Sequence, residues 1–323
     1  MKFNFRYSDG FDKLTTSLAG LFLACRPKFL TASAAPVLVG SALGYAVTGH
    51  FQPALFTLAL LAVMALHAGA NLANDYFDHL SGNDPANKNP TPFSGGSRFI
   101  QNGILSPKTI LLESLISLTV GSAAGLVIVL LTKSIFILIV GLIGLLGGFF
   151  YTAPPLRLGY RSVGEIAIAL LFGLLPVYAS CYLQTFAFDA AALLPACIVG
   201  ILIFLVILVN EFPDLAADAA VNKKTLVVRY GIAAAVRIYR LAIILSYILA
   251  IVAMLTHSRF FFAGLFYLFT LPIAVAAIKS ANKNDLAKPG RYRASRITVL
   301  LHAAGSLALA AGFIISALYN PPI

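Results

Sequence analysis

Residues 53–78 read PALFTLALLAVMALHAGANLANDYFD, an apolar run that ends in an acidic motif. The run from 53 to 74 contains no Asp, Glu, Lys or Arg, and as a helix it is long enough to cross a hydrocarbon core of roughly 30 Å. Lipid offers the backbone no hydrogen-bond partners, so a helix is the expected structure. The stretch therefore predicts a membrane-spanning helix that carries two carboxylates, Asp75 and Asp78, at its end.

The same kind of apolar run recurs along the whole chain. Of the 323 residues, 59% are hydrophobic and 11% are charged, whereas an ordinary soluble domain carries roughly a quarter charged residues. We expect nine spans, near residues 29–48, 53–74, 108–131, 134–152, 164–184, 191–210, 233–256, 260–279 and 297–318. No long polar stretch marks a separate soluble domain. The sequence thus predicts an all-α polytopic membrane protein, in which residues 1–323 form a single membrane-embedded domain.

The basic residues are distributed unevenly across the predicted connections. With nine spans, 21 of the 23 Lys and Arg residues fall on the side of the N-terminus, and only Lys133 and Arg259 fall on the other. Cytoplasmic loops of membrane proteins carry such an excess of basic residues. We therefore expect the N-terminal side to be cytoplasmic. The formal net charge of +11 then reflects topology and contact with anionic membrane lipid, and no nucleic acid partner is expected.

Two predicted spans end in acidic motifs on this same side, at residues 71–84 and 210–218. The helical repeat places the polar residues of each motif on one face: Asn71, Asp75 and Asp78 in the first and, if the helix continues past Pro213, Asn210, Asp214 and Asp218 in the second. Neighbouring carboxylates repel each other and are costly at membrane depth, and a divalent cation relieves both problems. Two such helix ends facing each other can hold two Mg²⁺ ions around one diphosphate. The alternative is that the acids pair with nearby Lys and Arg and only anchor the helix ends.

Each acidic motif is followed by a polar, basic loop. In the first loop, the stretch Ser94-Gly95-Gly96-Ser97 offers N–H donors to phosphate oxygens, although it does not have the spacing of a P-loop. Basic side chains in both loops complement the remaining negative charge of a phosphate. A third loop on the same side, residues 151–161, contains two arginines and two tyrosines. That loop is equally typical of an interfacial aromatic belt.

Four stretches between residue 26 and residue 231 form a more specific pattern. They are Arg26-Pro27-Lys28 with Ala35-Pro36 and Gly40; Asn74-Asp75-Tyr76-Phe77-Asp78 with Ser81-Gly82-x-Asp84; Tyr151-Thr152 with Leu158-Gly159-Tyr160-Arg161 and Gly164-Glu165; and Asn210-Glu211-Phe212-Pro213-Asp214 with Asp218 and Lys223-x-Thr225-Leu226, ending at Arg229 and Gly231. This pattern resembles the UbiA superfamily of membrane prenyltransferases, and within it the MenA-like branch of 1,4-dihydroxy-2-naphthoate polyprenyltransferases. The chain departs from the wider superfamily at Gly82, where relatives often have a further Asp, and Asp84 is the candidate substitute. It departs again at Asn222, where relatives commonly have Gly.

The resemblance implies nine helices around a central cavity and a Mg²⁺-dependent reaction in a bacterial or archaeal cell membrane. The substrates would be a polyprenyl diphosphate and an aromatic acceptor. In the MenA-like branch the acceptor is 1,4-dihydroxy-2-naphthoate, its ring carboxylate leaves as carbon dioxide, and the product enters menaquinone biosynthesis. The resemblance leaves the oligomeric state and the length of the prenyl chain open.

The resemblance also assigns roles to individual residues. Mg²⁺, as two ions, would be bound by Asp75, Asp78, Asp214 and Asp218. Three amides, Asn71, Asn74 and Asn210, would orient these ligands or contact the diphosphate. The diphosphate would also be held by Lys88, Arg98, Arg161, Lys223 and Arg229. An allylic cation formed on ionisation can be stabilised by the face of an aromatic ring, for which Tyr151 is the first candidate and Tyr76 the second.

Three other functions are compatible with parts of the pattern. A UbiA-type enzyme acting on 4-hydroxybenzoate or another phenol would need the same diphosphate site. A cation or organic-anion transporter would show acids at corresponding depths on both sides of the membrane, whereas here the motif acids lie on one side. A CDP-alcohol phosphotransferase would resemble Asp-Gly-x-x-Ala-Arg, and neither acidic motif has that form.

Overall fold

The computed structural model describes residues 19–282, 286 and 291–319. Helices and the loops between them account for these residues, which confirms the all-α prediction. The α-helices are α2 (Pro27–Thr48), α3 (Pro53–Leu80), α4 (Asn83–Ala86), α5 (Pro107–Thr132), α6 (Ile135–Phe149), α7 (Gly164–Ile168), α8 (Leu175–Thr185), α9 (Leu193–Ala220), α10 (Leu226–Thr256), α11 (Phe261–Leu268), α12 (Leu271–Ser280) and α14 (Arg293–Tyr319). Short 3₁₀ segments are η1 (Leu158–Tyr160), η3 (Ala190–Ala192) and η4 (Ser258–Phe260), and η2 (Ala169–Leu174) is a π-helical segment between α7 and α8.

Local sequence explains where many of these helices begin and bend. Proline opens α2, α3 and α5, where its missing N–H has no intrahelical partner to lose. The side chains of Ser106, Ser134 and Thr225 accept hydrogen bonds from the first turns of α5, α6 and α10. Helix α10 is interrupted at Gly231, whose φ of 79° is not helical. Helix α9 continues through Pro213 to Ala220, so the second acidic motif is helical throughout.

Seven helical segments of the described chain are long and apolar enough to cross a membrane. An eighth span results if the pair Ser258–Leu268 and Leu271–Ser280, bent by 50°, is taken as one crossing. Helix α6 is apolar but only 15 residues long, or roughly 22 Å at 1.5 Å per residue. The protein is therefore an integral membrane protein, as expected, while the predicted count of nine spans is not confirmed.

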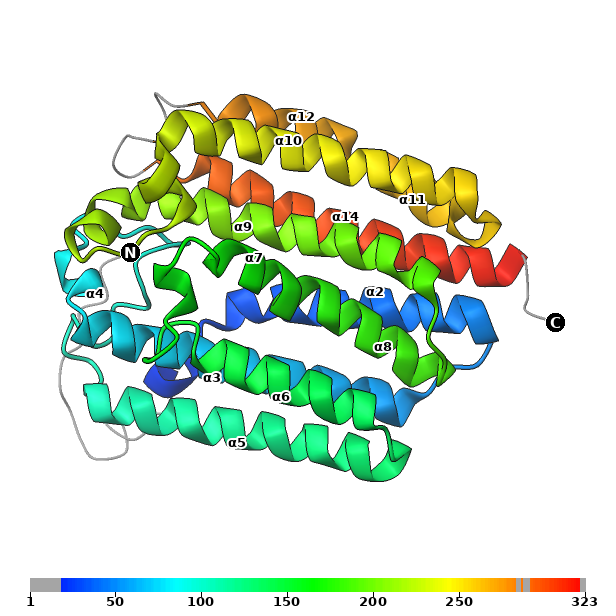
Figure 1. Cartoon of the computed structure of the whole chain (residues 1–323), viewed down its shortest axis with the longest axis horizontal. Coiled ribbons are helices and arrows are strands. Elements are labelled where there is room, and N and C mark those ends of the chain that lie inside the picture. Colours follow the sequence, from blue (N-terminus) through cyan, green and yellow to red (C-terminus); the bar gives the residue numbers. More distant parts are fainter. Residues whose placement is uncertain (1–18, 283–285, 287–290, 320–323) are drawn as a thin grey trace.

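The long helices lie side by side in one bundle (Figure 1). Helix α2 begins at one end of this bundle and α14 finishes at the opposite end (Figure 1). The acidic ends of α3 and α9 lie at the same end, together with α4 and the connection from α9 to α10. Many large apolar side chains on the outside, such as Leu131 and Leu255, are exposed, which suits contact with lipid.

Small residues let the helices of this bundle approach closely, as is common in membranes. A Cβ added to Gly40 on α2 would collide with the Val177 carbonyl oxygen and the Ser180 side chain on α8. A Cβ added to Gly173 in η2 would lie 2.5 Å from the Gly200 Cα on α9. In contrast, a Cβ added to Gly125 on α5 would meet no atom within 4 Å. The two classes of glycine therefore have different structural roles.

We expect Gly40→Ala to destabilise the protein, because the new methyl group has no space between α2 and α8. Overpacking of this kind costs about 1–3 kcal/mol. Gly125→Ala is the matched control and should be neutral or slightly stabilising, since its Cβ enters open space and Ala favours a helix. Thermal unfolding of both variants in detergent measures the difference. Equal losses of stability would contradict the close α2–α8 contact.

Candidate active site

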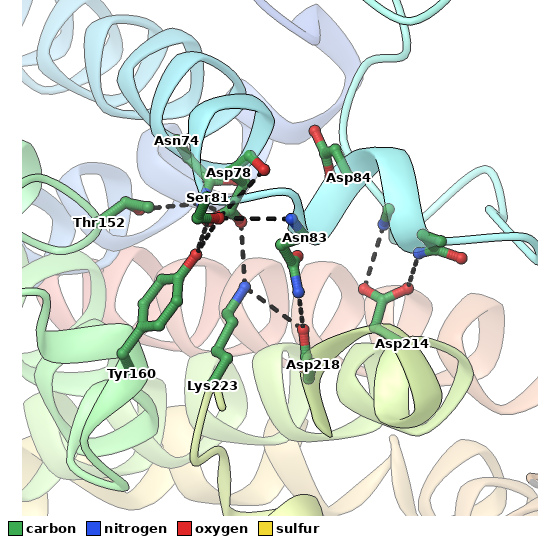
Figure 2. Close-up of polar contacts among 12 residues, drawn as sticks. Asn74, Asp78, Ser81, Asn83, Asp84, Thr152, Tyr160, Asp214, Asp218 and Lys223 are labelled. Atoms are coloured by element: carbon green, nitrogen blue, oxygen red, sulfur yellow. Dashed lines mark hydrogen bonds and ion pairs between the residues drawn. The ribbon is translucent and has the colours of Figure 1, made fainter. Parts of the chain in front are cut away.

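The two acidic motifs meet at one end of the bundle. Asp75 and Asp78 are buried near the end of α3, and Asp218 is buried near the end of α9. The short helix α4 and the loop that follows it lie between the two motifs (Figure 2). The sequence prediction that the two helix ends face each other is consistent with the contacts described next.

Lys223 links the two motifs. Its Nζ lies 3.0 Å from Asp78 Oδ2 on α3 and 3.6 Å from Asp218 Oδ1 on α9 (Figure 2). Burial by itself would lower the pKa of Lys223, but the carboxylates of Asp78 and Asp218 outweigh burial and raise this pKa well above its ordinary value. The ammonium therefore remains charged and offsets the repulsion between the two carboxylates.

Neutral donors complete the environment of the same two carboxylates. The Tyr160 hydroxyl donates to Asp78 Oδ1 at 2.7 Å, and Asn74 Nδ2 donates to Asp78 Oδ2 at 3.0 Å. Asn83 Nδ2, at the start of α4, donates to Asp218 Oδ1 at 2.9 Å. Figure 2 shows these side chains converging from separate elements. Each carboxylate is thus positioned by contacts from outside its own helix.

The loop between α4 and α5 closes over Asp214. Asn87 Nδ2 donates to Asp214 Oδ1 at 2.7 Å, and the Gly95 backbone N–H donates to Asp214 Oδ2 at 3.1 Å. Gly95 has a φ of +78°, and a Cβ at this position would lie 2.6 Å from Asn87 Nδ2. The position therefore requires glycine both for its backbone conformation and for space. One loop of the first half of the chain thereby fixes a carboxylate of the second half.

Asp75 and Asp84 form the remaining acidic part of the site. Asp75 is paired with the Arg26 guanidinium, and both of its oxygens accept from the Ser97 backbone N–H at 3.2 Å. The Asp84 carboxylate packs against Gly96, whose φ is +76°. Burial, assisted by the charges of Asp78 and Asp75, raises the pKa of Asp84 to about 7. The Asp84 carboxyl is consequently less readily ionised than an ordinary exposed Asp.

The residues predicted from the sequence do not all join this cluster. Asn71 Nδ2 and Asn210 Oδ1 are buried and lack hydrogen-bond partners among the described residues, so both are available to a ligand. Arg98 donates from Nη1 to the Asp84 carbonyl oxygen. The packing of Tyr151 against Gly159 and Gly164 places its ring next to the Tyr160 loop.

Three predicted phosphate ligands lie at the surface of this end. Lys88 is exposed in the loop after α4. Arg161 is also exposed, and its Nη2 donates to the Pro155 carbonyl oxygen at 3.0 Å. Arg229 is exposed and stacks over the Tyr230 ring, with 5.3 Å between the guanidinium carbon and the ring centroid. The structure places these three cations outside the carboxylate contacts, and their phosphate-binding role stays a prediction.

Sequence reasoning missed several residues that contact the carboxylates directly, namely Arg26, Asn83, Asn87 and Tyr160. It also missed Thr152, whose hydroxyl accepts a hydrogen bond from Asn74 Nδ2 at 2.9 Å. Arg26 precedes α2 and is far from Asp75 in the sequence, so no spacing rule connects the two. Asn83 and Asn87 are four residues apart, which in a helix places them on one face. That spacing could have identified these two amides as candidate site residues from the sequence. Thr152 and Tyr160 were visible only as parts of a loop motif.

The donor set fits Mg²⁺. Hard cations prefer carboxylate and amide oxygens, and Mg²⁺ commonly uses one or two carboxylates together with phosphate oxygens and water. Asp75, Asp78, Asp214 and Asp218 supply the carboxylates, and the unpartnered Asn210 Oδ1 supplies an amide oxygen. Within the described residues, no set of three or more His, Cys, Asp or Glu side chains is arranged to hold an ion alone. A Mg²⁺ ion here would complete its coordination with a phosphate-bearing substrate.

Deeper in the bundle, an apolar cavity of about 340 Å³ lies among α3, α5, α6, η2 and α8. Its walls include five glycines from α5 and α6: Gly121, Gly125, Gly141, Gly144 and Gly148. Along α3 the cavity extends from Leu66 to Ala59, which is roughly 14–24 Å from Asp75 at 1.5 Å per residue. The bundle therefore combines a charged end with an apolar chamber beneath it.

Comparison with known proteins agrees with this architecture. The UbiA prenyltransferase family matches residues 33–297. The 2-carboxy-1,4-naphthoquinone phytyltransferase of Synechocystis sp. is 28% identical over 90% of this chain and 91% of its own length. The 1,4-dihydroxy-2-naphthoate octaprenyltransferase of Mycobacterium leprae is 31% identical over 75% of this chain and 80% of its own.

A solved structure shows the same fold. A UbiA homolog from Archaeoglobus fulgidus, bound to GPP and Mg²⁺, superimposes with a TM-score of 0.66 at 18% identity. The match covers 90% of this chain and 99% of that one. Together with the family match, this likeness confirms the resemblance predicted from the motifs. The chain belongs to the UbiA prenyltransferase family and is a membrane-embedded prenyltransferase.

Proposed function

We propose that this enzyme transfers a polyprenyl group from a polyprenyl diphosphate to 1,4-dihydroxy-2-naphthoate, with loss of the ring carboxylate as carbon dioxide. The carrying observation is that two relatives of similar length are named for different prenyl chains but for the same kind of acceptor, a naphthalene ring with a carboxyl group at position 2. The proposal places the enzyme in menaquinone biosynthesis. We also propose that the carboxylate end faces the cytoplasm of a bacterial or archaeal cell, because almost all basic residues gather on that side.

The charged end of the bundle would bind the diphosphate. Asp75, Asp78, Asp214 and Asp218 would hold Mg²⁺, and two ions match the two carboxylate pairs. When bound, Mg²⁺ neutralises the negative charge that the diphosphate gathers as it leaves. Lys223 and Arg26 already pair with Asp78 and Asp75, so both cations are in place beside an incoming diphosphate.

The protein's own groups can then assist the departure of the diphosphate. Lys223 is mostly buried, and its carboxylate neighbours raise its pKa, so it stays charged. Its ammonium could contact a phosphate oxygen if the Asp78 carboxylate held Mg²⁺. Asn71 Nδ2, which has no partner in the described structure, is a further donor at this level of α3. These groups act on charge that develops during the reaction, where fixed donors contribute most.

The allylic carbon needs a different environment. Tyr160 already has the Arg157 guanidinium over its ring, with 4.1 Å between the guanidinium carbon and the ring centroid. Lys223 Nζ is a second cation near this ring, 5.3 Å from its centroid. A further positive charge on the same ring is therefore disfavoured, which leaves Tyr151 as the better aromatic neighbour for positive charge on the prenyl group. The apolar cavity would take the rest of the prenyl chain. Its lining is almost wholly aliphatic, as an isoprenoid tail requires.

Among aromatic acceptors, 4-hydroxybenzoate or another phenol is the second candidate, since it would use the same diphosphate site. Purified enzyme should convert 1,4-dihydroxy-2-naphthoate, polyprenyl diphosphate and Mg²⁺ into a prenylated, decarboxylated naphthoquinol detectable by mass spectrometry. EDTA should abolish the product, because the carboxylates alone repel the diphosphate. A product formed only from 4-hydroxybenzoate would retain the diphosphate site and refute the proposed acceptor.

We expect Asp75→Asn and Asp214→Asn each to reduce turnover by about 10²-fold or more, because each removes charge needed to hold the metal and diphosphate. Asp189→Asn is the matched control. Asp189 has no contact with the described residues of this site; its partly exposed carboxylate pairs with Arg259 at 3.4 Å. Steady-state kinetics in detergent should show near-normal turnover for this control. Full activity of both site variants would refute the metal assignment.

Filling the apolar cavity should shift the enzyme's preference toward prenyl diphosphates with shorter chains. At Gly141 and Gly144 an added Cβ meets no atom within 4 Å, so a larger side chain can enter the cavity without displacing the helix. We expect Gly141→Leu to lower kcat/KM for long polyprenyl diphosphates much more than for geranyl diphosphate. Ala123→Leu, at an exposed position of α5 outside the cavity lining, is the matched control for an added Leu side chain. An equal loss with all chain lengths would show that the tail lies elsewhere.

A further inference from the structure

A histidine lies inside the bundle, below the carboxylate site. His67, in the middle of α3, has its Nδ1 2.6 Å from Ser33 Oγ on α2. Ser33 is completely buried. The His67 ring also meets Phe172 of η2 edge-on, with 4.8 Å between the ring centroids. Because Phe172 lines the apolar cavity, His67 borders that cavity on the side that faces the carboxylate site.

His67 is aligned with the carboxylate site along α3. His67, Asn71 and Asp75 follow one another at intervals of four residues, so they occupy one face of the helix, each about 6 Å further along its axis. Asn71 Nδ2 is buried without a partner among the described residues. A polar column therefore descends from the diphosphate site toward the apolar cavity, and His67 is its lowest member.

One nitrogen of His67 remains for a ligand. The Ser33 contact uses Nδ1, and whichever group donates across it, Nε2 is the nitrogen left over. No hydrogen bond to Nε2 is formed within the described part of the chain. The ring is nevertheless only half-buried, although α2 and η2 cover it, so part of it faces internal space. An unpaired ring nitrogen at membrane depth is costly, and a ligand with a polar group would satisfy it.

The neighbouring backbone also departs from regular helix. Residues Ala169–Leu174 form a π-helical turn, and this widened turn carries Phe172 against the His67 ring. Such turns inside longer helices are frequent at functional sites. Here the turn places Phe172 at the boundary between the polar column and the apolar cavity. The flat ring of an aromatic substrate can lie at this boundary, between the column and the cavity.

We propose that His67, held by Ser33, binds a ring hydroxyl of the aromatic acceptor through Nε2. The inference rests on the proposed prenyl transfer. Below the diphosphate, the prenyl donor has only carbon and hydrogen, so a hydrogen bond at this level must come from the second substrate. A hydroxyl fits better than a carboxylate, because a carboxylate this deep would need a cation as its partner. His67 is thus an acceptor-positioning residue between the two substrate sites.

The test measures KM and kcat for both substrates in His67→Leu and His67→Gln, using the hydroxylated acceptor that the wild type prenylates. We expect His67→Leu to raise the acceptor KM by about tenfold, the effect of one buried hydrogen bond. The KM for polyprenyl diphosphate should stay within about twofold. His67→Gln should recover most of the loss, because its amide can replace the ring nitrogen. His302→Leu, at a buried histidine on α14, should leave both KM values unchanged.

Other outcomes would show whether the His67 inference or the proposed prenyl transfer is wrong. Equal rises in both KM values together with a lower unfolding temperature would mean that His67 only joins α2 to α3, and the inference would be wrong. An unchanged acceptor KM in His67→Leu would also overturn it, while the prenyl transfer itself would stand. If the wild type prenylated neither 1,4-dihydroxy-2-naphthoate nor 4-hydroxybenzoate, the proposed function would fail first, and this inference with it.

Discussion

The contact of Lys223 with Asp78 and Asp218 is the interaction on which the site depends. Two carboxylates from distant parts of the chain approach one another at a helix end, where water is scarce and repulsion is strong. A single ammonium, that of the mostly buried Lys223, makes that approach possible. Arg26, the residue that precedes α2, pairs with Asp75 separately. The ends of α2, α3 and α9 are therefore held near one another by ion pairs between oppositely charged side chains.

Helix α4 and the loop from α4 to α5 connect these ion pairs, because their residues donate hydrogen bonds to carboxylates of both acidic motifs. Asn83 contacts Asp218, Asn87 and Gly95 contact Asp214, and Ser97 contacts Asp75. All of these donors are neutral, so they orient the carboxylates without cancelling their charge. The scaffold beneath is held by close helix contacts at small residues, which leave little freedom for α2 and α8 to move apart. A rigid bundle thus presents a charged, partly neutralised cluster at one end.

Much of this organisation could be predicted from the sequence, and the exceptions have physical reasons. The apolar runs and the four-residue spacing of Asp214 and Asp218 predicted the helices and their shared face, and α9 continues through Pro213 as that face requires. The partner of Asp75 could not be predicted, because Arg26 reaches it through tertiary packing alone. Lys88 and Arg161 lie in the expected loops and Arg229 lies in the first turn of α10, yet charge and position along the chain do not determine where a long side chain points. The apolar cavity arises from missing side chains on α5 and α6, which hydropathy does not reveal.

The apolar cavity and the diphosphate-binding groups are built by different helices. The groups that handle the diphosphate belong to α3, α9 and their loops, whereas the glycines that define the volume of the chamber belong to α5 and α6. A change in one glycine can alter the space for a hydrocarbon chain while every carboxylate stays where it is. In an evolving lineage, the length of the lipid tail is therefore free to diverge while the head-group chemistry is inherited intact.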